Sequence, residues 1–396
     1  MGRIVLGSGK DRSLVRRHPW VFSGAVAKVS EELADGDLVE VVSSKGEWLG
    51  RGFFSRHSSI AVRILTFERE EEINGDFFKT RLLSAWNARA ERWNGQSHNA
   101  VRWVHGEGDG LPGLVIDRYS DVISLQLLTS GMDIRRDTIL KAISGIFPEC
   151  SVYERSDVAM RKHEGLDERK GLLVGKEPNG RIPVAANGLK WFVSVESGHK
   201  TGGYLDQVDN WNKVGVLAKG KDVLDAFCYG GGFALSCLKS GAKSVLAVDS
   251  SQPALDVFAE NMRLNEVESD RCAVRCCDVF TVLREFRDRG KSFDMIILDP
   301  PKFADSKGHV EKACRAYKDI NLLAFKLLRP DGVLATFSCS GGVSPELFQK
   351  VVADAALDAK RDASVIDRYT QAPDHPVALP CPEGLYLKGL LVRCRG

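Results

Sequence analysis

A short stretch near the middle of the chain decides the fold: Val223-Leu224-Asp225-Ala226-Phe227-Cys228-Tyr229-Gly230-Gly231-Gly232-Phe233. Its first part predicts a short buried strand that ends near Asp225. The glycines that follow let the backbone approach a ligand without a side-chain clash. The pattern is neither G-x-G-x-x-G nor a phosphate loop with a Lys-Ser/Thr pair, which disfavours NAD and nucleoside triphosphates. One glycine-rich turn is weak evidence for a cofactor site, so the interpretation depends on the strands on either side of it.

On either side of this stretch, apolar strands alternate with helical stretches. We expect strands at 223–227, 244–249, 293–298 and 332–337, each followed by a helix. This alternation is typical of an α/β domain with a doubly wound, mostly parallel sheet. Ligands of such sheets bind at the carboxyl ends of the strands, near the point where the strand order reverses.

Acidic residues stand where three successive predicted strands end. After Asp225, Asp249 ends the next strand, where an acid can accept hydrogen bonds from both ribose hydroxyls. Asp278 ends the strand-like segment 273–278, where it could meet an adenine amino group. Each acid alone could instead cap the helix that follows it. Together they favour an adenosyl cofactor, for which S-adenosylmethionine is the natural candidate.

The segment 197–207 is rich in glycine and mixed polar residues, which predicts a loop. Two interpretations stay open for it. It could cover the methionine end of the cofactor, or it could be a mobile loop between domains.

Two motifs carry the chemistry. In Asp299-Pro300-Pro301 the prolines fix φ at about −65°, which can hold the carboxylate against a flat base. That motif alone favours methylation of a planar nitrogen. Cys339 favours methylation of cytosine C5 instead. That carbon is not nucleophilic until a thiolate adds to C6. A buried strand-end cysteine is the alternative, but the flanking Ser338, Ser340, Gly341 and Gly342 predict a polar and open site.

The first half of the chain has a different pattern. Predicted strands at 37–42, 48–54 and 60–65 indicate a small barrel within residues 1–67. A helix over 76–97, a hairpin over 114–119 and 122–128, a helix near 133–146 and a strand at 151–155 indicate a central α+β unit.

Bulk properties exclude several classes of protein. The 396 residues contain no apolar run of membrane-spanning length, and the N-terminus lacks the apolar core of a signal peptide, so we expect a cytoplasmic protein. The ten cysteines are scattered without a C-x-x-C pair, so we expect no metal. Since the net charge is only +2, nucleic-acid binding would need a local patch. Residues 1–30 offer one, although it could also be a solvated basic face.

Several motifs make the chain closely similar to the bacterial ribosomal RNA large subunit methyltransferase I family, which forms 5-methylcytosine in 23S rRNA. The resemblance runs nearly end to end. It rests on the runs 16–25 (Arg-Arg-His-Pro-Trp-Val-Phe-Ser-Gly-Ala), 198–202 (Gly-His-Lys-Thr-Gly), 205–207 (Leu-Asp-Gln), 299–303 (Asp-Pro-Pro-Lys-Phe), 337–340 (Phe-Ser-Cys-Ser) and 382–389 (Pro-Glu-Gly-Leu-Tyr-Leu-Lys-Gly).

The resemblance implies three domains: an N-terminal PUA pseudobarrel that binds RNA (1–70), a central α+β domain (71–185) and a Rossmann-like methyltransferase domain (186–396). It also implies 23S rRNA as substrate, a homodimer and Cys339 as the nucleophile; Asp299 is the second candidate catalytic residue. The candidate RNA-binding residues are Arg12, Arg16 and Arg17 of the basic stretch 1–30, together with Lys302. The candidate cofactor-binding residues are Lys200, Thr201, Gly202, Tyr204, Gln207, Asp225, Cys228, Gly230, Gly231, Asp249, Ser250, Asp278, Val279 and Asp299.

One position departs from a common pattern. Many RNA cytosine-C5 methyltransferases carry a second cysteine just after the Asp-Pro pair, where it assists product release. Here that position is Pro301. The chain therefore resembles a single-cysteine branch, and the base that removes the C5 proton stays unassigned. Two other functions stay open: an rRNA guanine N-methyltransferase, and a non-catalytic RNA-binding ribosome assembly factor.

Overall fold

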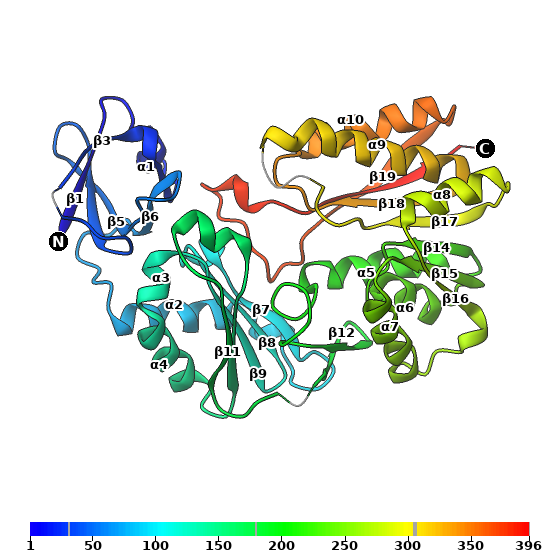
Figure 1. The fold of residues 1–396 in the computed structure, drawn as a ribbon, viewed down its shortest axis with the longest axis horizontal. Helices are drawn as coiled ribbons and strands as arrows, with labels where there is room; N and C mark the ends of the chain where they lie inside the picture. The colour runs from blue at the N-terminus through cyan, green and yellow to red at the C-terminus, as the bar shows by residue number, and fades with distance from the viewer. Residues whose placement is uncertain (31, 179, 304–306, 396) are drawn as a thin grey trace. The chain divides into compact units, whose positions relative to one another are not determined.

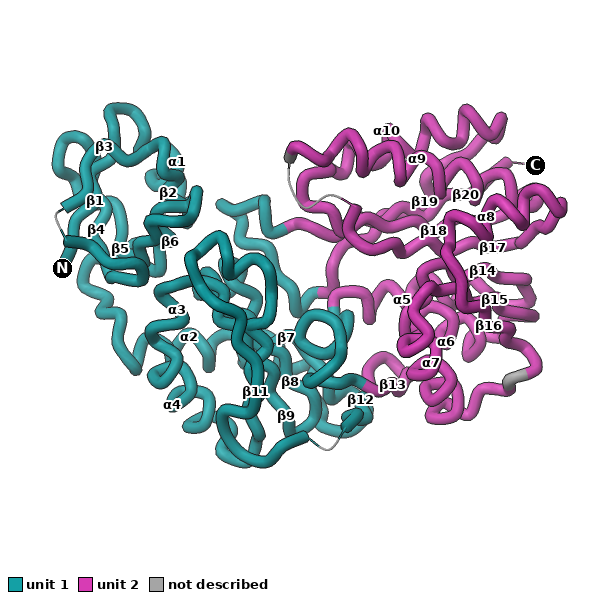
Figure 2. The backbone as a smooth tube through the Cα atoms, in the orientation of Figure 1, with its two compact units in different colours: residues 1–184, 193–205, 373–384 teal, residues 185–192, 206–372, 385–396 magenta. Residues whose placement is uncertain are grey.

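The computed structural model describes residues 1–30, 32–178, 180–303 and 307–395. The chain divides into two compact units, coloured separately in Figure 2. Unit 1 comprises residues 1–184, 193–205 and 373–384, and unit 2 comprises 185–192, 206–372 and 385–396. Each unit therefore contains segments from distant parts of the sequence.

Unit 1 begins with a six-stranded sheet in the order β2-β6-β5-β4-β1-β3. All neighbours are antiparallel except β1 and β4. Alternation of apolar and polar residues gives the sheet a buried face with Ile4, Val39, Val41 and Val62. The elements are β1 (Gly2–Leu6), α1 (Arg12–Val15), β2 (Trp20–Phe22), β3 (Val26–Val29), β4 (Leu38–Val42), β5 (Trp48–Phe54) and β6 (Ile60–Thr66).

A second sheet of unit 1 has the order β11-β10-β9-β8-β7. Its elements are α2 (Gly75–Asn87), β7 (Ala100–His105), β8 (Leu114–Tyr119), β9 (Val122–Leu127), α3 (Ser130–Ile134), α4 (Arg136–Ile146), β10 (Ser151–Ser156) and β11 (Arg169–Val174). The helix expected over 76–97 is shorter than predicted. It ends at Asn87 because Arg89 turns inward, where its buried guanidinium donates to the carbonyls of Ala85 and Arg102.

A short hairpin, β12 (Ile182–Ala186) and β13 (Leu189–Val193), precedes the large sheet of unit 2. That sheet has the order β16-β15-β14-β17-β18-β20-β19, which confirms the doubly wound prediction. Its strands are β14 (Asp222–Ala226), β15 (Ser244–Asp249), β16 (Cys272–Cys276), β17 (Phe293–Leu298), β18 (Leu328–Ser338), β19 (Ala363–Thr370) and β20 (Lys388–Cys394). The strands from β16 to β18 are parallel, whereas β20 and β19 are antiparallel additions.

Helices cover both faces of this sheet (Figure 1). On one face lie α8 (Val279–Asp288), α9 (Val310–Leu327) and α10 (Pro345–Asp358), whose apolar side chains share a core with the strands. On the other lie α5 (Val208–Gly215), α6 (Gly232–Lys239) and α7 (Gln252–Leu264). The strand order reverses between β14 and β17, so their carboxyl ends mark the expected ligand site. None of the helices in the described ranges is long and apolar enough to span a membrane.

Candidate active site

Asp225 stands at the carboxyl end of β14 and is fully buried. Its Oδ2 accepts a hydrogen bond of 2.9 Å from the backbone N–H of Ala234 in the first turn of α6. Its Oδ1 accepts no hydrogen bond from any residue that the structure describes. Burial, with the negative charges of Asp299 and Asp249, raises the pKa of Asp225 to about 8. A buried acceptor without a donor is suited to a ligand that brings one.

The loop after β14 has a backbone that requires glycine. Gly231 has a φ of +81°, and a Cβ there would lie 1.9 Å from a ring carbon of Phe258 on α7. Neighbouring Gly230 accepts a hydrogen bond of 2.9 Å from Asn261 through its carbonyl oxygen. Cys228 is buried, and burial raises the pKa of its thiol. These contacts form a tight backbone cradle beside Asp225.

Asp249 at the end of β15 fixes this loop. One carboxylate oxygen accepts a hydrogen bond of 2.9 Å from the backbone N–H of Tyr229, and the other accepts one of 2.9 Å from Ser251. The exposed Ser250 lies between the acid and the helix. A carboxylate offers about four acceptor positions, so Asp249 keeps capacity for ligand hydroxyls.

Asp278 caps a helix, which is the alternative that the sequence left open for each acid. β16 ends two residues before it, at Cys276, and Asp278 is the N-cap of α8. Its Oδ1 accepts hydrogen bonds of 2.8 Å from both the backbone N–H and the hydroxyl of Thr281. The cap satisfies donors that the first turn of the helix would leave unpaired. Asp278 is exposed, and Val279 beside it is buried.

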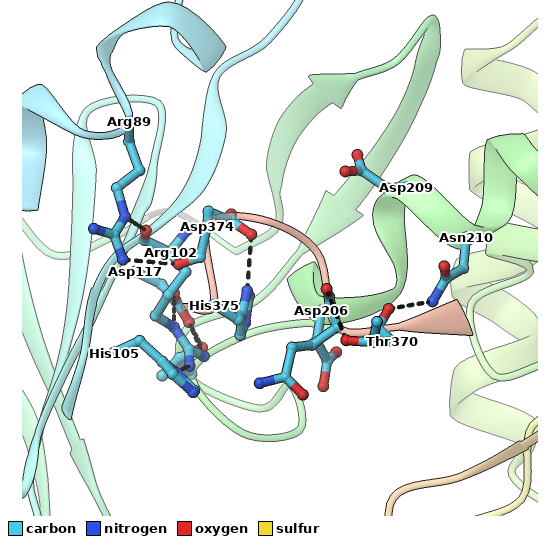
Figure 3. Close-up of polar contacts among 12 residues, drawn as sticks. Arg89, Arg102, His105, Asp117, Asp206, Asp209, Asn210, Thr370, Asp374 and His375 are labelled. Carbon is cyan, nitrogen blue, oxygen red and sulfur yellow. Dashed lines mark hydrogen bonds and ion pairs between the residues drawn. The ribbon is translucent and has the colours of Figure 1, made fainter. Parts of the chain in front are cut away.

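Asp299 follows β17 directly and is oriented by residues before α5 and within it. Gln207 donates from Nε2 to Asp299 Oδ1 at 3.0 Å, and its own Oε1 accepts from Asn210 at 2.7 Å. The buried Asn210 also donates to the carbonyl of Thr370 on β19 at 3.0 Å (Figure 3). Gln207 is therefore a positioning residue for Asp299. Nothing in the local sequence marked Asn210, whose role depends on distant partners.

Cys339 follows the last residue of β18 and is partly exposed. Gly341 and Gly342 are exposed, as the prediction of an open site expects, but Ser338 and Ser340 on either side of the thiol are fully buried. They are held from inside: Tyr317 on α9 lies 3.0 Å from the Ser340 hydroxyl, and Ser338 Oγ accepts from the Ser340 N–H at 3.3 Å. The register pairs Leu298 of β17 with Thr336 of β18. Asp299 and Cys339 therefore follow neighbouring strands at one edge of the sheet.

The remaining cofactor candidates, Lys200, Thr201, Gly202 and Tyr204, belong to unit 1. Thr201 is fully buried, its hydroxyl donates to Asp117, and the Tyr119 hydroxyl lies 3.1 Å away. Lys200 lies over the ring of Tyr204, 4.4 Å from its centroid. Within unit 1, Thr201 thus anchors the segment 193–205.

The candidate RNA-binding cations are exposed. Arg12 and Arg16 lie at the two ends of α1, and Lys302 follows β17 in unit 2. Arg17 is exposed as well, but its guanidinium lies 3.3 Å from Glu68 and over the ring of Phe67.

One group of three possible metal ligands occurs in the described residues: His18, Cys381 and Glu383. His18 Nδ1 accepts a hydrogen bond from the backbone N–H of Trp20 at 3.1 Å, so the ring proton resides on Nε2. That Nε2 lies 3.2 Å from the Glu383 carboxylate, to which it donates. A ring nitrogen engaged in this way is a poor metal ligand, and the pair is an ordinary hydrogen bond of unit 1.

Known proteins share the sequence pattern and the fold of this chain. A PUA-like domain family matches residues 4–67, and the S-adenosylmethionine-dependent methyltransferase family matches residues 157–393. A SAM-dependent methyltransferase structure from Streptococcus mutans superposes with a TM-score of 0.86 at 21% identity, covering 99% of this chain and 100% of that one. Another solved methyltransferase, in complex with SAH, has a TM-score of 0.87 at 22% identity, with coverage of 99% and 100%. Fold and site together define an S-adenosylmethionine-dependent methyltransferase.

Two curated relatives identify the family of this chain within that class of methyltransferases. Both are called Ribosomal RNA large subunit methyltransferase I: one from Aeromonas hydrophila, 49% identical over 99% of both chains, and one from Shewanella amazonensis, 50% identical over 99% of both chains. The chain belongs to this family, as its motifs predicted.

Proposed function

We propose that the protein methylates C5 of a cytosine in 23S ribosomal RNA through a covalent bond between Cys339 Sγ and C6 of the ring. The observation that carries the proposal is the adjacency of two strand ends: Asp299 follows β17 and Cys339 follows β18. A nucleophile and a base-orienting carboxylate at one sheet edge fit this chemistry. The names of the relatives support the ribosomal RNA substrate.

The cradle after β14 suits the cofactor. Asp225 offers a buried oxygen to a donor, Asp249 has acceptor capacity for ribose hydroxyls, and Gly230 and Gly231 leave the backbone open to close approach. S-adenosylmethionine, when bound there, supplies the electrophilic methyl group that an activated C5 takes. Contacts from Lys200, Thr201, Gly202, Tyr204, Cys228, Ser250, Asp278 and Val279 are part of the proposal.

The residues of the chain then act on the base. The thiolate of Cys339 adds to C6, so that an Sγ–C6 bond forms and C5 becomes an enamine-like carbon. After C5 is methylated, a base removes its proton, and elimination breaks the Sγ–C6 bond and restores the thiolate. Asp299 steadies the ring during both steps.

Release without a second cysteine is also part of the proposal. Cys228 is buried, and burial raises the pKa of its thiol. Burial also raises the pKa of Cys314 on α9. Both thiols are therefore poorly suited to act as thiolates near neutral pH.

The test combines nucleoside analysis with trapping. Cys339→Ala should lower turnover by about 10⁴-fold or more, because it removes the covalent pathway. Cys314→Ala is the matched control and should keep wild-type turnover. RNA containing 5-fluorocytosine should form a denaturant-stable adduct with the wild type and none with Cys339→Ala. Mass spectrometry showing a methylated guanine, or near-normal 5-methylcytosine from Cys339→Ala, would favour the N-methyltransferase alternative; no methylation at all would favour an assembly factor.

The cellular setting follows from the substrate. Ribosomal RNA is processed in the bacterial cytoplasm, so the proposal places the protein there. The PUA-like domain and the exposed Arg12, Arg16 and Arg17 would bind RNA backbone, with Lys302 near the catalytic edge. A homodimer, as the resemblance implies, is also proposed.

A further inference from the structure

Lys388, the first residue of β20, is a buried cation whose role the proposed mechanism does not include. Its side chain is 6% exposed. Nζ donates two hydrogen bonds of 2.6 Å, to the carbonyl oxygens of Ser340 and Val343. The antiparallel register pairs Lys388 with Ser338. Cys339 therefore lies between a residue that pairs with Lys388 and a residue that accepts its hydrogen bond.

These contacts fix the loop that carries the thiol. The two carbonyls held by Lys388 lie three residues apart, so the ammonium closes the turn after β18. Tyr317 holds the Ser340 hydroxyl from the opposite element, α9. A short loop held by two elements keeps the partly exposed side chain of Cys339 in one orientation.

The charge of Lys388 lacks a counterion among these hydrogen-bond partners, because both are neutral carbonyls. Burial lowers the pKa of Lys388 to about 8, and the negative form of Cys339 acts in the opposite direction. At neutral pH the side chain is thus mainly an ammonium. Each member of a lysine–thiolate pair stabilises the charged form of the other.

We propose that Lys388 is the positioning residue of the nucleophile: it holds the 338–343 loop and stabilises the thiolate of Cys339. The inference rests on the proposed function. When the thiol ionises, the Sγ–H bond breaks, the electron pair stays on sulfur, the proton leaves to solvent, and Lys388 remains an ammonium. A nucleophilic cysteine beside a cation has a larger thiolate fraction at neutral pH than an isolated one.

Two tyrosines among the described residues near this pair stay neutral between pH 6 and about 9. Burial raises the pKa of Tyr317 on α9, and it raises that of Tyr369 on β19 to about 12. Arg368 on β19 lines the same small cavity as Lys388. Neither tyrosine therefore accounts for a change in Cys339 reactivity over this pH range, and the Lys388 variants test whether Lys388 does.

The experiment measures how fast iodoacetamide alkylates Cys339 from pH 6 to 9.5, quantified on the Cys339 peptide by mass spectrometry. Lys388→Met removes charge and hydrogen bonds, Lys388→Gln retains N–H donors without charge, and Lys388→Arg retains the charge. At pH 7 we expect about tenfold slower alkylation in the Met and Gln variants, since a rise of one pKa unit lowers the thiolate fraction tenfold. The Arg variant should stay within about twofold of wild type.

Lys221→Met is the matched control. Lys221 is also a partly buried lysine whose ammonium donates to one carbonyl, that of Leu217, at 2.6 Å, and burial lowers its pKa. It precedes β14, at the edge of the parallel strands opposite to Cys339, so its loss should leave Cys339 alkylation unchanged. The fully buried Cys237 reports folding in each variant, since it stays unmodified in an intact unit 2. Should Lys388→Met misfold, Lys388→Gln and Lys388→Arg still decide the outcome.

Wild-type alkylation of Cys339 in Lys388→Gln at each pH would overturn the inference, as would equal slowing in Lys221→Met. Failure of the proposed function gives a different result: Cys339→Ala would still methylate RNA, whatever the alkylation rates. In methyl transfer, Lys388→Gln should lower kcat about tenfold at pH 7 and recover toward higher pH, while affinity for S-adenosylmethionine stays unchanged.

Discussion

Two buried aspartates, one in each unit, have opposite surroundings. Asp225 in unit 2 has one backbone donor on Oδ2 and none on Oδ1 among the described residues. Asp374 in unit 1 accepts from the Arg102 backbone N–H at 2.9 Å and contacts His375 Nδ1 at 2.8 Å (Figure 3). Burial raises the pKa of Asp225 to about 8. Burial acts in the same direction on Asp374, but His375, the Arg102 hydrogen bond and the charge of Arg92 outweigh it and lower its pKa to about 2.

This difference indicates a structural role for Asp374 and a ligand-binding role for Asp225. Asp374 belongs to a satisfied network: Arg89 donates to the Asp374 carbonyl at 2.9 Å, and Arg102 pairs with the buried Asp117. Such a network fixes the segment 373–384 within unit 1. Asp225 instead sustains a desolvation cost that its own unit does not offset, which is expected of a group kept for a ligand.

The largest effect expected from this contrast is the loss of stability in Asp374→Asn. Removing the charge should cost about 3–5 kcal/mol of unfolding free energy at pH 7, because it leaves buried partners unpaired. The folded pKa of Asp374 lies below its ordinary 3.8. Its contribution is therefore complete above pH 3.8 and is lost as the pH falls through about 2. Urea unfolding at several pH values measures this.

Glu68→Ala provides the control in the same unit. Glu68 pairs with Arg17 across 3.3 Å, with both side chains largely exposed, so its loss should cost less than about 1 kcal/mol. A deficit in Asp374→Asn no larger than that of Glu68→Ala would contradict the structural role given to the network.

Replacing Asp225 by Asn should instead increase the stability of the folded protein. The pKa of Asp225 rises from 3.8 to about 8 on folding, so between these pH values the folded state binds the extra proton. Stability should then fall as the pH rises from 4 to 8. Asp225→Asn removes that dependence, and at pH 8 it should be more stable than wild type by on the order of 3 kcal/mol. Parallel stability profiles for the two proteins without cofactor would disprove this.

The two aspartates also differ in how visible they are in the sequence. Asp225 is a candidate from the sequence alone because it stands near the end of an apolar strand that leads to three glycines, which is a local pattern. Asp374 lies in a loop-like stretch, Gln371-Ala372-Pro373-Asp374, and its partner Arg102 is 272 positions away. Lys388 likewise acts on residues 45 and 48 positions away. Periodicity predicts strands and strand ends, but it does not predict which distant side chains meet.

The same limit explains the predictions that failed. The helix over 76–97 has a helical pattern throughout, yet inward packing of Arg89 ends it at Asn87. Serine and glycine around Cys339 predicted a polar, open site, which fits the exposed Gly341 and Gly342 but not the buried Ser338 and Ser340. Composition alone does not show that Lys388 and Tyr317 bind this loop from inside. For Asp278 the sequence left both a strand end and a helix cap open, and the structure has the helix cap.

A third aspartate, Asp249, combines a structural role with a ligand-binding one. Its two bonds to backbone N–H groups are structural, while its free acceptor positions suit a ribose. We expect Asp249→Ala to weaken S-adenosylmethionine binding by about 1.5–3 kcal/mol, the range for hydrogen bonds to a charged group. Isothermal titration measures it, with Asp256→Ala, which removes an exposed acid of α7, as control. Unaltered affinity would make Asp249 a loop anchor only, like Asp374.

The smallest expected effect is on RNA binding, and it concerns the exposed arginines of unit 1 rather than the buried aspartates. Arg12 and Arg16 at the ends of α1 are exposed, so their replacement should leave stability nearly unchanged. If they contact RNA phosphate, each Arg→Ala change should reduce the slope of log affinity against log salt by about 0.7–0.9, through the loss of one counterion-releasing contact. Filter binding of 23S rRNA fragments between 50 and roughly 300 mM salt would measure the slopes. Arg395→Ala, which replaces an exposed cation of unit 2, is the control and should leave the slope unchanged. An equal decrease with Arg395→Ala would mean that RNA responds to total charge, whereas no decrease with Arg12→Ala and Arg16→Ala would assign phosphate binding to other cations, Lys302 among them.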